Sequence, residues 1–279
     1  MELNEVKIVA DSSSDIVKMN KVAFSSAALK IITSNKEYID NDELNVEAMI
    51  DDLEKNKEKI TTACPSTADW LDAFNGGKYI YCITITSNLS GAYNSALLAK
   101  KEYLEKNPEA KVCVIDSLST GPECKLIAEK LEELIVSGKD FEEISKEINE
   151  YKKNTHLLFM LESVKNLKNN GRVSPLLAKI IGVLGIRLVG KASDEGTLEV
   201  LSKVRGENHS IGTIISHMKA HNFNGGKVRI SHCRNESYAL KLKEKILETY
   251  KNAEIEIYKA KALCSFYAEN GGLLIGFEG

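Results

Sequence analysis

Hydroxyl side chains gather in four segments of the sequence, and each segment stands between a strand-like apolar run and a helix-like pattern. Such a position leaves the backbone N–H groups of a helix's first turn free beside the hydroxyls, and the helix dipole favours an anion there. A carboxylate or a phosphate group would therefore suit these segments as a ligand. The four segments are residues 11–15, 61–66, 86–93 and 116–121.

Helix capping is the alternative role for these Ser and Thr residues, because a side-chain oxygen at the N-cap satisfies one free N–H group. Thr61 and Thr62 precede the predicted cap at Ser66, and Ser90 stands beside Gly91, which lets a backbone approach closely. Capping therefore explains Thr61, Thr62 and Ser90 less well than it explains the other hydroxyl residues. Capping boxes, in which an acid in the first turn reciprocates, are predicted for Ser66 with Asp69, Thr120 with Glu123 and Asp140 with Glu143.

A second signal lies in residues 169–175, where a turn leads into a Ser N-cap at Ser174 and a proline, Pro175, at the first helical position. The helix predicted after it is apolar around most of its circumference. Such a helix is buried on nearly all sides or lines an apolar cavity. Ordinary core is the alternative interpretation.

Apolar runs of strand length alternate with amphipathic stretches of helix length, which predicts an α/β fold with a mainly parallel sheet covered by helices. Residues 1–155 are expected to form one α/β domain, with strands at 6–10, 28–32, 79–85 and 112–115. Residues 156–279 are expected to form a smaller α/β domain. The sequence leaves open whether the last strand, 273–277, packs back on the first domain. Parallel sheets bind ligands beyond the carboxyl ends of their strands, where the hydroxyl segments are expected to meet.

The composition limits the classes of function. The 279 residues carry a net charge of −3 with Lys and Arg spread along the chain, so nucleic acid is not expected as a partner. The acidic N-terminus lacks the regions of a signal peptide, and no stretch reaches the roughly twenty apolar residues that span a bilayer. The protein is therefore expected in the cytoplasm. The six cysteines lack CxxC pairs, so neither a metal nor another cofactor is expected.

Four motifs, taken in order along the chain, resemble the DegV family. They are Asp-Ser-x-Ser-Asp after the opening strand, then Thr-x-x-Pro-Ser from Thr62, Leu-Ser-Gly-x-Tyr-x-Ser-Ala from Leu89, and Gly-Arg-Val-Ser from Gly171. None of these motifs is specific by itself. The ordered set, however, extends over nearly all 279 residues.

The resemblance implies a two-domain carrier, and not an enzyme, that binds a single long-chain fatty acid. The carboxylate would lie near the domain junction, held by Thr62 and Ser90, and the tail would lie inside apolar structure. Further head-group contacts would come from Thr61, Gly91 and Tyr267. The residues of the predicted apolar helix that would contact the tail are Leu177, Ile180, Ile181 and Leu184.

The resemblance also implies partners. In some bacteria such proteins present the fatty acid to a separate kinase, and Arg172 and Arg205 match arginines near the pocket mouth that help docking. Solvated surface arginines are the alternative interpretation. The ligand implied is palmitate or a similar acid of about sixteen to eighteen carbon atoms. Transient contact with a membrane surface is compatible with this carrier role.

Three residues depart from the family pattern. Ala63 and Cys64 follow the Thr where the family commonly has Ser-Gln, which removes one hydroxyl. Tyr267 stands roughly where the family has a histidine before its C-terminal glycines. A phenol can still bind a carboxylate, but it cannot supply the positive charge of a histidine to an acyl phosphate.

Other functions remain as alternatives. Ser90 could be the nucleophile of an esterase or another small-molecule hydrolase, although it lies outside a Gly-x-Ser-x-Gly motif. His217 and His221 have the spacing of metal ligands on a helix, but the protease motif would need Glu where Met218 stands. A nucleotide-binding module is suggested by the alternating pattern alone, since neither a Walker A run nor Gly-x-Gly-x-x-Gly occurs.

Overall fold

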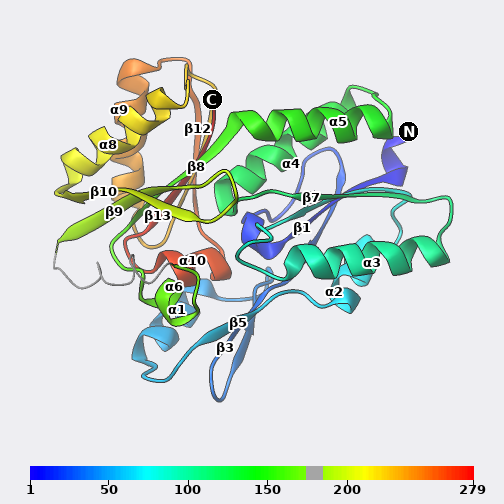
Figure 1. The fold of residues 1–279 in the computed structure, drawn as a ribbon, viewed down its shortest axis with the longest axis horizontal. Coiled ribbons are helices and arrows are strands. Elements are labelled where there is room, and N and C mark those ends of the chain that lie inside the picture. Colours follow the sequence, from blue (N-terminus) through cyan, green and yellow to red (C-terminus); the bar gives the residue numbers. More distant parts are fainter. Residues whose placement is uncertain (174–184) are drawn as a thin grey trace.

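The structure is a computed structural model that describes residues 1–173 and 185–279. The tail contacts expected from Leu177, Ile180, Ile181 and Leu184 lie outside the described residues. In the described part, helices alternate with strands that form three sheets (Figure 1). The α/β fold class is therefore confirmed. None of the described helices is long and apolar enough to cross a bilayer.

The first sheet has four parallel strands in the order β2-β1-β6-β7. Both of its faces are buried, as is usual for parallel sheets. The face with Ile8 and Tyr81 packs on α4 and α5, and the face with Val9 and Cys82 packs on α2 and α3. The strands are β1 Val6–Asp11, β2 Ala23–Ala27, β6 Tyr79–Thr84 and β7 Lys111–Asp116, and the helices are α2 Thr67–Phe74, α3 Ala92–Lys106, α4 Gly121–Val136 and α5 Phe141–Tyr151.

The second sheet has six strands in the order β10-β9-β8-β13-β11-β12. Strands β11 and β12 are parallel, and the other neighbours are antiparallel. Leu158 and Met160 lie on the face covered by α8 and α9 (Figure 1). The last strand lies between β8 and β11, and its other face meets α4. The elements are β8 Thr155–Leu161, β9 Ile186–Ala192, β10 Leu198–Arg205, α8 Glu207–Ala220, β11 Lys227–His232, α9 Glu236–Thr249, β12 Glu254–Lys259 and β13 Leu273–Glu278.

A third, smaller sheet has the antiparallel order β4-β3-β5. Beside it lies α10, a short helix near the middle of the molecule that contacts β3, α1 and α6 (Figure 1). The strands of this third sheet contain three residues each, so they are too short to show the alternation of apolar and polar residues that identifies a strand in the sequence. The elements are β3 Lys30–Ile32, β4 Glu37–Ile39, α1 Val46–Lys55, β5 Thr61–Ala63, α6 Lys165–Asn169 and α10 Ala262–Ala268, and short 3-10 turns lie at η1 Leu3–Glu5, η2 Ser12–Ser14 and η3 Lys152–Asn154.

Two of the three predicted capping boxes are confirmed. Ser66 caps α2 and Asp140 caps α5, each with a reciprocal bond from the acid in the first turn. The box at Thr120 is wrong, since that side chain makes no cap bond to α4. Glu123 is buried and accepts a hydrogen bond from Thr155 Oγ1 at 2.8 Å, so it is turned toward the second sheet and not toward its own N-cap.

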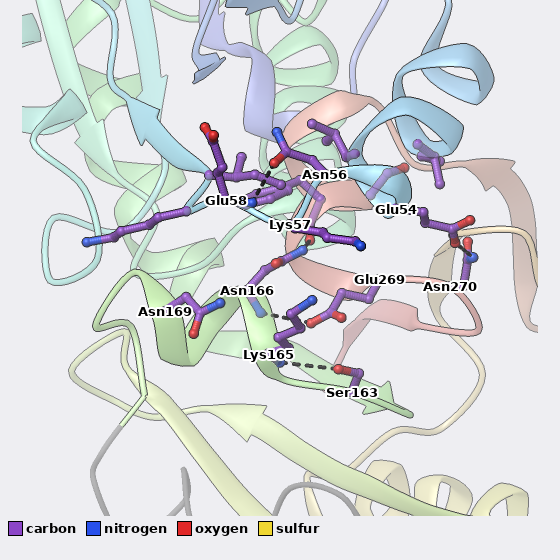
Figure 2. A pocket seen from close by; sticks show the side chains of 16 residues that line it. Glu54, Asn56, Lys57, Glu58, Ser163, Lys165, Asn166, Asn169, Glu269 and Asn270 are labelled. Atoms are coloured by element: carbon purple, nitrogen blue, oxygen red, sulfur yellow. Dashed lines mark hydrogen bonds between the residues drawn. The ribbon is translucent and has the colours of Figure 1, made fainter. Parts of the chain in front are cut away.

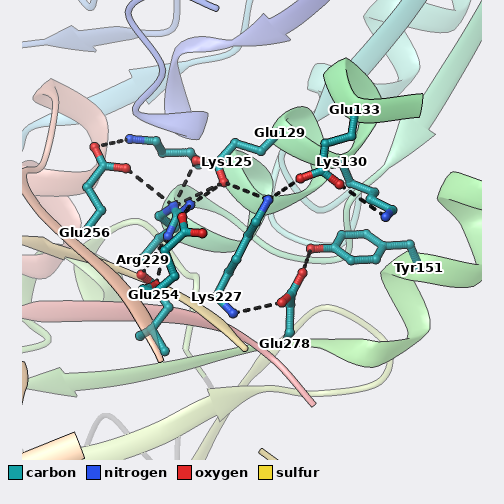
Figure 3. A network of polar contacts seen from close by, with 11 residues as sticks. Lys125, Glu129, Lys130, Glu133, Tyr151, Lys227, Arg229, Glu254, Glu256 and Glu278 are labelled. Carbon is teal, nitrogen blue, oxygen red and sulfur yellow. Dashed lines mark hydrogen bonds and ion pairs between the residues drawn. The ribbon is translucent and has the colours of Figure 1, made fainter. Parts of the chain in front are cut away.

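An ion-pair network joins the two halves of the chain (Figure 3). Arg229 of β11 donates to Glu129 of α4 at 2.7 Å and to Glu254 of β12 at 2.6 Å, and its side chain is 5% exposed. Lys125 of α4 pairs with Glu256 at 2.7 Å. Because the Arg229 guanidinium is buried but has carboxylates on two sides, its charge is compensated. The network fixes α4 against the second sheet.

Candidate ligand-binding site

A cavity of about 320 Å³ lies between the two halves of the chain. This volume falls at the small end of the range of about 300–1,000 Å³ that small-molecule sites occupy. Leu157, Phe159 and Leu161 form part of its wall, because alternate side chains of β8 point to the same face of the sheet. Leu198 of β10 and Leu274 of β13 extend this apolar wall. A long apolar group is therefore the part of a ligand that this wall would bind.

Hydroxyl groups gather at another part of the cavity. Thr62 Oγ1 lies 2.7 Å from Tyr267 OH, at hydrogen-bond distance, although the two residues are 205 positions apart. Ser90 and Gly91 also line the cavity, just before the first residue of α3. Strand β5 supplies Thr62, the loop after β6 supplies Ser90, and α10 supplies Tyr267. The cavity thus combines an apolar wall with hydroxyl donors and the positive end of a helix dipole.

The loop that carries Ser90 is held at several points. Ser90 N–H donates to Thr86 O at 3.2 Å, and Ser90 Oγ accepts from Ala92 N–H at 3.3 Å. Thr86 Oγ1 donates to Gly196 O at 2.8 Å, which ties the loop to the β9–β10 turn. Gly196 has a φ of +75°, and a Cβ there would collide with Thr86 Oγ1, so this close approach requires glycine. These contacts fix the position of the Ser90 hydroxyl.

Charge is scarce in the cavity. Of the described residues that line it, Arg172 alone carries a formal charge, and its Nη1 donates to Asn170 O at 3.3 Å. Burial raises the pKa of Tyr267, while the bond to Thr62 and the charge of Arg172 oppose that rise. The phenol is therefore neutral near neutral pH and remains a hydrogen-bond donor. An anionic head group would meet one cation and several neutral donors.

Some residues of the expected head group and pocket mouth do not line the cavity. Thr61 is not among the residues that line the cavity, although Thr62, Ala63 and Cys64 after it are. Arg205 is exposed at the end of β10 and also does not line it. The serines of the first hydroxyl segment bind other protein groups, as when Ser12 Oγ accepts from Leu29 N–H at 3.0 Å. That segment is buried structure and not a head-group site.

Two further polar residues of this cavity differ in how far the sequence indicated them. Thr120, in the hydroxyl segment 116–121, lines it and donates to Ser13 O at 3.3 Å, where the sequence predicted a helix cap. Cys264 of α10 lines it as well and donates to the same carbonyl at 3.2 Å. A helix preceded by Lys261, with Ala, Leu, Cys and Ser in its first turn, carries no sequence signal that could have placed Cys264 here.

A second pocket, of about 610 Å³, lies on the other side of α10 (Figure 2). Its wall is mostly polar and includes charged side chains of α1 and α6, such as Glu54 and Lys165. Asn166 and Glu269 face each other there, and Asn166 N–H donates to Glu269 Oε1 at 3.0 Å. An acyl chain would have to displace water from these polar groups, so the cavity at Thr62 is the better site for an apolar ligand.

Comparison with known proteins identifies the family of this chain. The model of the family described as uncharacterised protein, DegV family, matches residues 5–278. The chain belongs to the DegV family. A DegV domain-containing protein of Streptococcus pneumoniae is 43% identical over 276 residues, which are 98% of each chain.

Two solved DegV structures resemble this one closely. A DegV family protein from Eubacterium eligens, loaded with heptadecanoic acid, is 42% identical with a TM-score of 0.96, and the match covers 98% of this chain and 99% of that one. The Streptococcus pneumoniae Fatty Acid Kinase B3 protein, loaded with linoleic acid, gives the same identity, TM-score and coverage. Both similar proteins therefore hold a long-chain fatty acid.

Buried carboxyl groups lie behind the cavity of this DegV chain. Burial raises the pKa of Asp11 to about 6 and that of Asp15 to about 7. Asp11 Oδ2 accepts from Ile85 N–H at 2.7 Å and so joins the ends of β1 and β6. Asp15 Oδ1 accepts from Lys261 N–H at 2.8 Å, whereas its Oδ2 has no hydrogen-bond partner among the described residues.

Asp15→Asn is expected to flatten the dependence of stability on pH. The pKa of Asp15 in the folded protein lies above its ordinary value of 3.8. The stabilising contribution of Asp15 to the folded state is therefore fully present below about pH 3.8 and is lost as the pH rises through about 7. Removing this group should reduce the slope of unfolding free energy against pH by up to about 1.4 kcal/mol per pH unit between about pH 5 and pH 7. Urea unfolding at several pH values measures the slope. Asp194→Asn removes an exposed carboxylate and is the control, and an unchanged slope for Asp15→Asn would contradict the expectation.

Proposed function

We propose that this DegV protein binds one long-chain fatty acid in the cavity between its two halves. The carboxylate accepts hydrogen bonds from Thr62 and Ser90, with Tyr267 and the backbone at Gly91 as further donors. The acyl tail lies along the wall formed by Leu157, Phe159, Leu161 and Leu198. The observation that carries this proposal is the combination, in one cavity, of an apolar wall with the hydroxyl pair Thr62 and Tyr267, 2.7 Å apart.

The two parts of the ligand have different roles in binding. Burying a methylene contributes about 0.8 kcal/mol, so about fourteen of them contribute up to roughly 11 kcal/mol before ordering costs. A hydrogen bond to a charged carboxylate contributes only on the order of 1.5–3 kcal/mol, because the carboxylate gives up hydration. The tail therefore supplies the affinity, and the hydroxyls select an acid and fix its orientation.

We propose binding without turnover. A serine esterase needs a base at hydrogen-bond distance from the nucleophile. Among the hydrogen bonds of the described residues, none joins Ser90 to a histidine, and Ser90 Oγ accepts from Ala92 N–H. His217 and His221 do not act as such a base. His221 Nδ1 lies 2.8 Å from His217 O, and the ring of His221 lies beside that of His156.

A fatty-acid kinase is the protein partner that we propose. The support is the 42% identity to the Fatty Acid Kinase B3 protein, and the transfer would take place in the cytoplasm, where a kinase finds ATP. Arg172 lines the cavity and would face the transferred phosphoryl group, whereas the exposed Arg205 would contact the kinase. Tyr267 adds a neutral donor, so the positive charge at this end of the cavity comes from Arg172.

We also propose that residues 1–155 and 156–279 are separate domains. Every strand of the six-stranded sheet begins at Thr155 or later. The cavity would then lie at the domain junction, where ligand sites are common.

Displacement of a fluorescent fatty acid by unlabelled competitors tests the proposed function. Saturated acids of about ten to eighteen carbons should compete better as the chain lengthens, by a factor of roughly four per methylene until the cavity is filled. The corresponding alcohols should compete less well than the acids. Competition that is independent of chain length would contradict the proposal.

A further inference from the structure

Helix α10 is too short to hold its own position. It has seven residues, and isolated helices of this length are not stable in water. Nevertheless its residues Leu263, Cys264, Tyr267 and Ala268 all line the cavity. Contacts with other elements must therefore fix the place of Tyr267.

The N-terminus of α10 is held by carboxylates from the start of the chain. Asp40 Oδ1 accepts from Ala262 N–H at 3.1 Å, and Asp40 Oδ2 accepts from Leu263 N–H at 3.0 Å. Asp15 accepts from Lys261 N–H just before them at 2.8 Å. Both carboxylates thus satisfy N–H groups that the first turn of a helix leaves free. Lys261 itself carries no side-chain cap bond, so the capping groups come from residues more than two hundred positions away.

Asp40 is also attached to the sheet that carries Thr62. It directly follows β4, its side chain is fully buried, and its N–H donates to Leu29 O at 2.9 Å. The central strand β3 pairs with β4 on one side and with β5 on the other, where Ile31 lies opposite Thr62. The Asp40 side chain therefore connects the third sheet, which contains Thr62, with α10, which contains Tyr267.

The other end of α10 is held independently. Asn166 Nδ2 of α6 donates to Phe266 O at 2.8 Å, and Asn166 N–H donates to Glu269 Oε1 at 3.0 Å (Figure 2). With this end fixed by α6, the contact at the first turn sets how the helix is rotated and how far it lies from β5. A substitution of Asp40 would therefore shift the position of the Tyr267 side chain, in addition to any loss of stability.

We propose that Asp40 is a positioning residue for the head-group site, holding α10 so that the Tyr267 hydroxyl meets Thr62. The inference rests on the proposed function, since it concerns the hydroxyls that select the acid head group. Asp40 makes no contact with the cavity itself, because it is not among the residues that line it.

The side chain of aspartate suits this role, because its two oxygens can accept one N–H each. Burial raises the pKa of Asp40, and the two N–H donors and the charge of Lys261 oppose that rise. The Lys261 ammonium is itself held by Asp42 at 2.8 Å. An asparagine at position 40 could accept only one of the two N–H groups and would turn an NH₂ group toward the other.

The test compares palmitate with methyl palmitate as ligands of Asp40→Asn. The ratio of their affinities should fall about tenfold, the equivalent of one lost hydrogen bond to a charged group. Tyr267→Phe should lower the ratio similarly, and the double variant should lower it no further than Tyr267→Phe alone. Asp140→Asn is the control for the same substitution at another helix N-terminus, because Asp140 accepts two N–H groups of α5 on its Oδ1 and α5 does not line the cavity.

A ratio that stays at the wild-type value in Asp40→Asn, while the wild type still prefers the acid, would overturn the inference and leave the proposed function intact. A wild type that binds neither ligand would instead overturn the proposed function.

If Asp40→Asn does not fold, Ala262→Pro removes one of the two N–H donors from the helix side. Proline is tolerated at the first helical position, and Lys261 before it already has the extended conformation that a following proline requires, with φ −72° and ψ −174°. The same fall in the ratio is expected there, and an unchanged ratio would again overturn the inference.

Discussion

Replacing Thr62 and Ser90 together by alanine is expected to weaken the binding of palmitate about a hundredfold, while methyl palmitate loses less than about threefold. The acid carries a full charge on the oxygens that the two hydroxyls would bind, whereas the ester carbonyl is a weaker, neutral acceptor. The apolar wall is unchanged in the variant, so the contribution of the tail is the same for both ligands. Displacement of a fluorescent fatty acid measures both affinities.

Matched controls for this prediction lie beside the two hydroxyls. Thr61 is next to Thr62 in β5, and Ser87 is in the same loop as Ser90, but neither lines the cavity. Thr61→Ala with Ser87→Ala should therefore leave the affinity for palmitate within about twofold of the wild type. Equal losses for the acid and the ester in Thr62→Ala with Ser90→Ala would mean that these hydroxyls do not hold the carboxylate.

Leu198→Trp is expected to lower the affinity for palmitate roughly fiftyfold. Leu198 lines the cavity from β10 and is only partly buried, so an indole there can take up cavity space while its N–H reaches water. If the ring displaces about three methylenes, each contributing about 0.8 kcal/mol, the loss is about 2.4 kcal/mol. Shorter acids should lose less, because they do not need the occupied space.

Leu201→Trp provides the control for added volume. Leu201 lies in the same strand and is also partly buried, but it packs against the core under α8 and α9. This variant should bind palmitate as the wild type does. Similar affinities for palmitate in Leu198→Trp and Leu201→Trp would contradict the placement of the tail along this wall.

The sequence predicted three strands of the main sheet, because β1, β6 and β7 are mostly apolar runs. The fourth strand, β2 Ala23–Ala27, contains Ser25 and Ser26 and was missed, and the predicted strand at 28–32 lies instead in the third sheet as β3 Lys30–Ile32. Residues 6–10 and 79–85 correspond to β1 Val6–Asp11 and β6 Tyr79–Thr84. The hydroxyl segments after β6 and β7 contribute to the cavity, as expected for the carboxyl ends of parallel strands, and the segment 61–66 contributes from β5 itself. Local pattern was sufficient for these features because each depends on residues close in the sequence.

Features that depend on distant contacts could not be predicted in this way. Helix α10 begins where Asp40 accepts hydrogen bonds from the N–H groups of Ala262 and Leu263. These two residues lie 222 and 223 positions after Asp40 in the chain. The predicted cap at Thr120 failed for the same kind of reason, since Glu123 accepts a hydrogen bond from Thr155 at the start of β8, 32 residues later in the chain. The resemblance to the DegV family placed Tyr267 near the head group, but its 2.7 Å contact with Thr62 required the fold.

Native mass spectrometry of the purified protein, followed by organic extraction, tests fatty-acid binding most directly. The intact protein should carry one additional mass of a long-chain acid, and the extract should contain that acid in a ratio of about one to one with the protein. Loss of the added mass in Thr62→Ala with Ser90→Ala would link it to the cavity. A protein that carries no acid and instead hydrolyses acyl esters would contradict the carrier function.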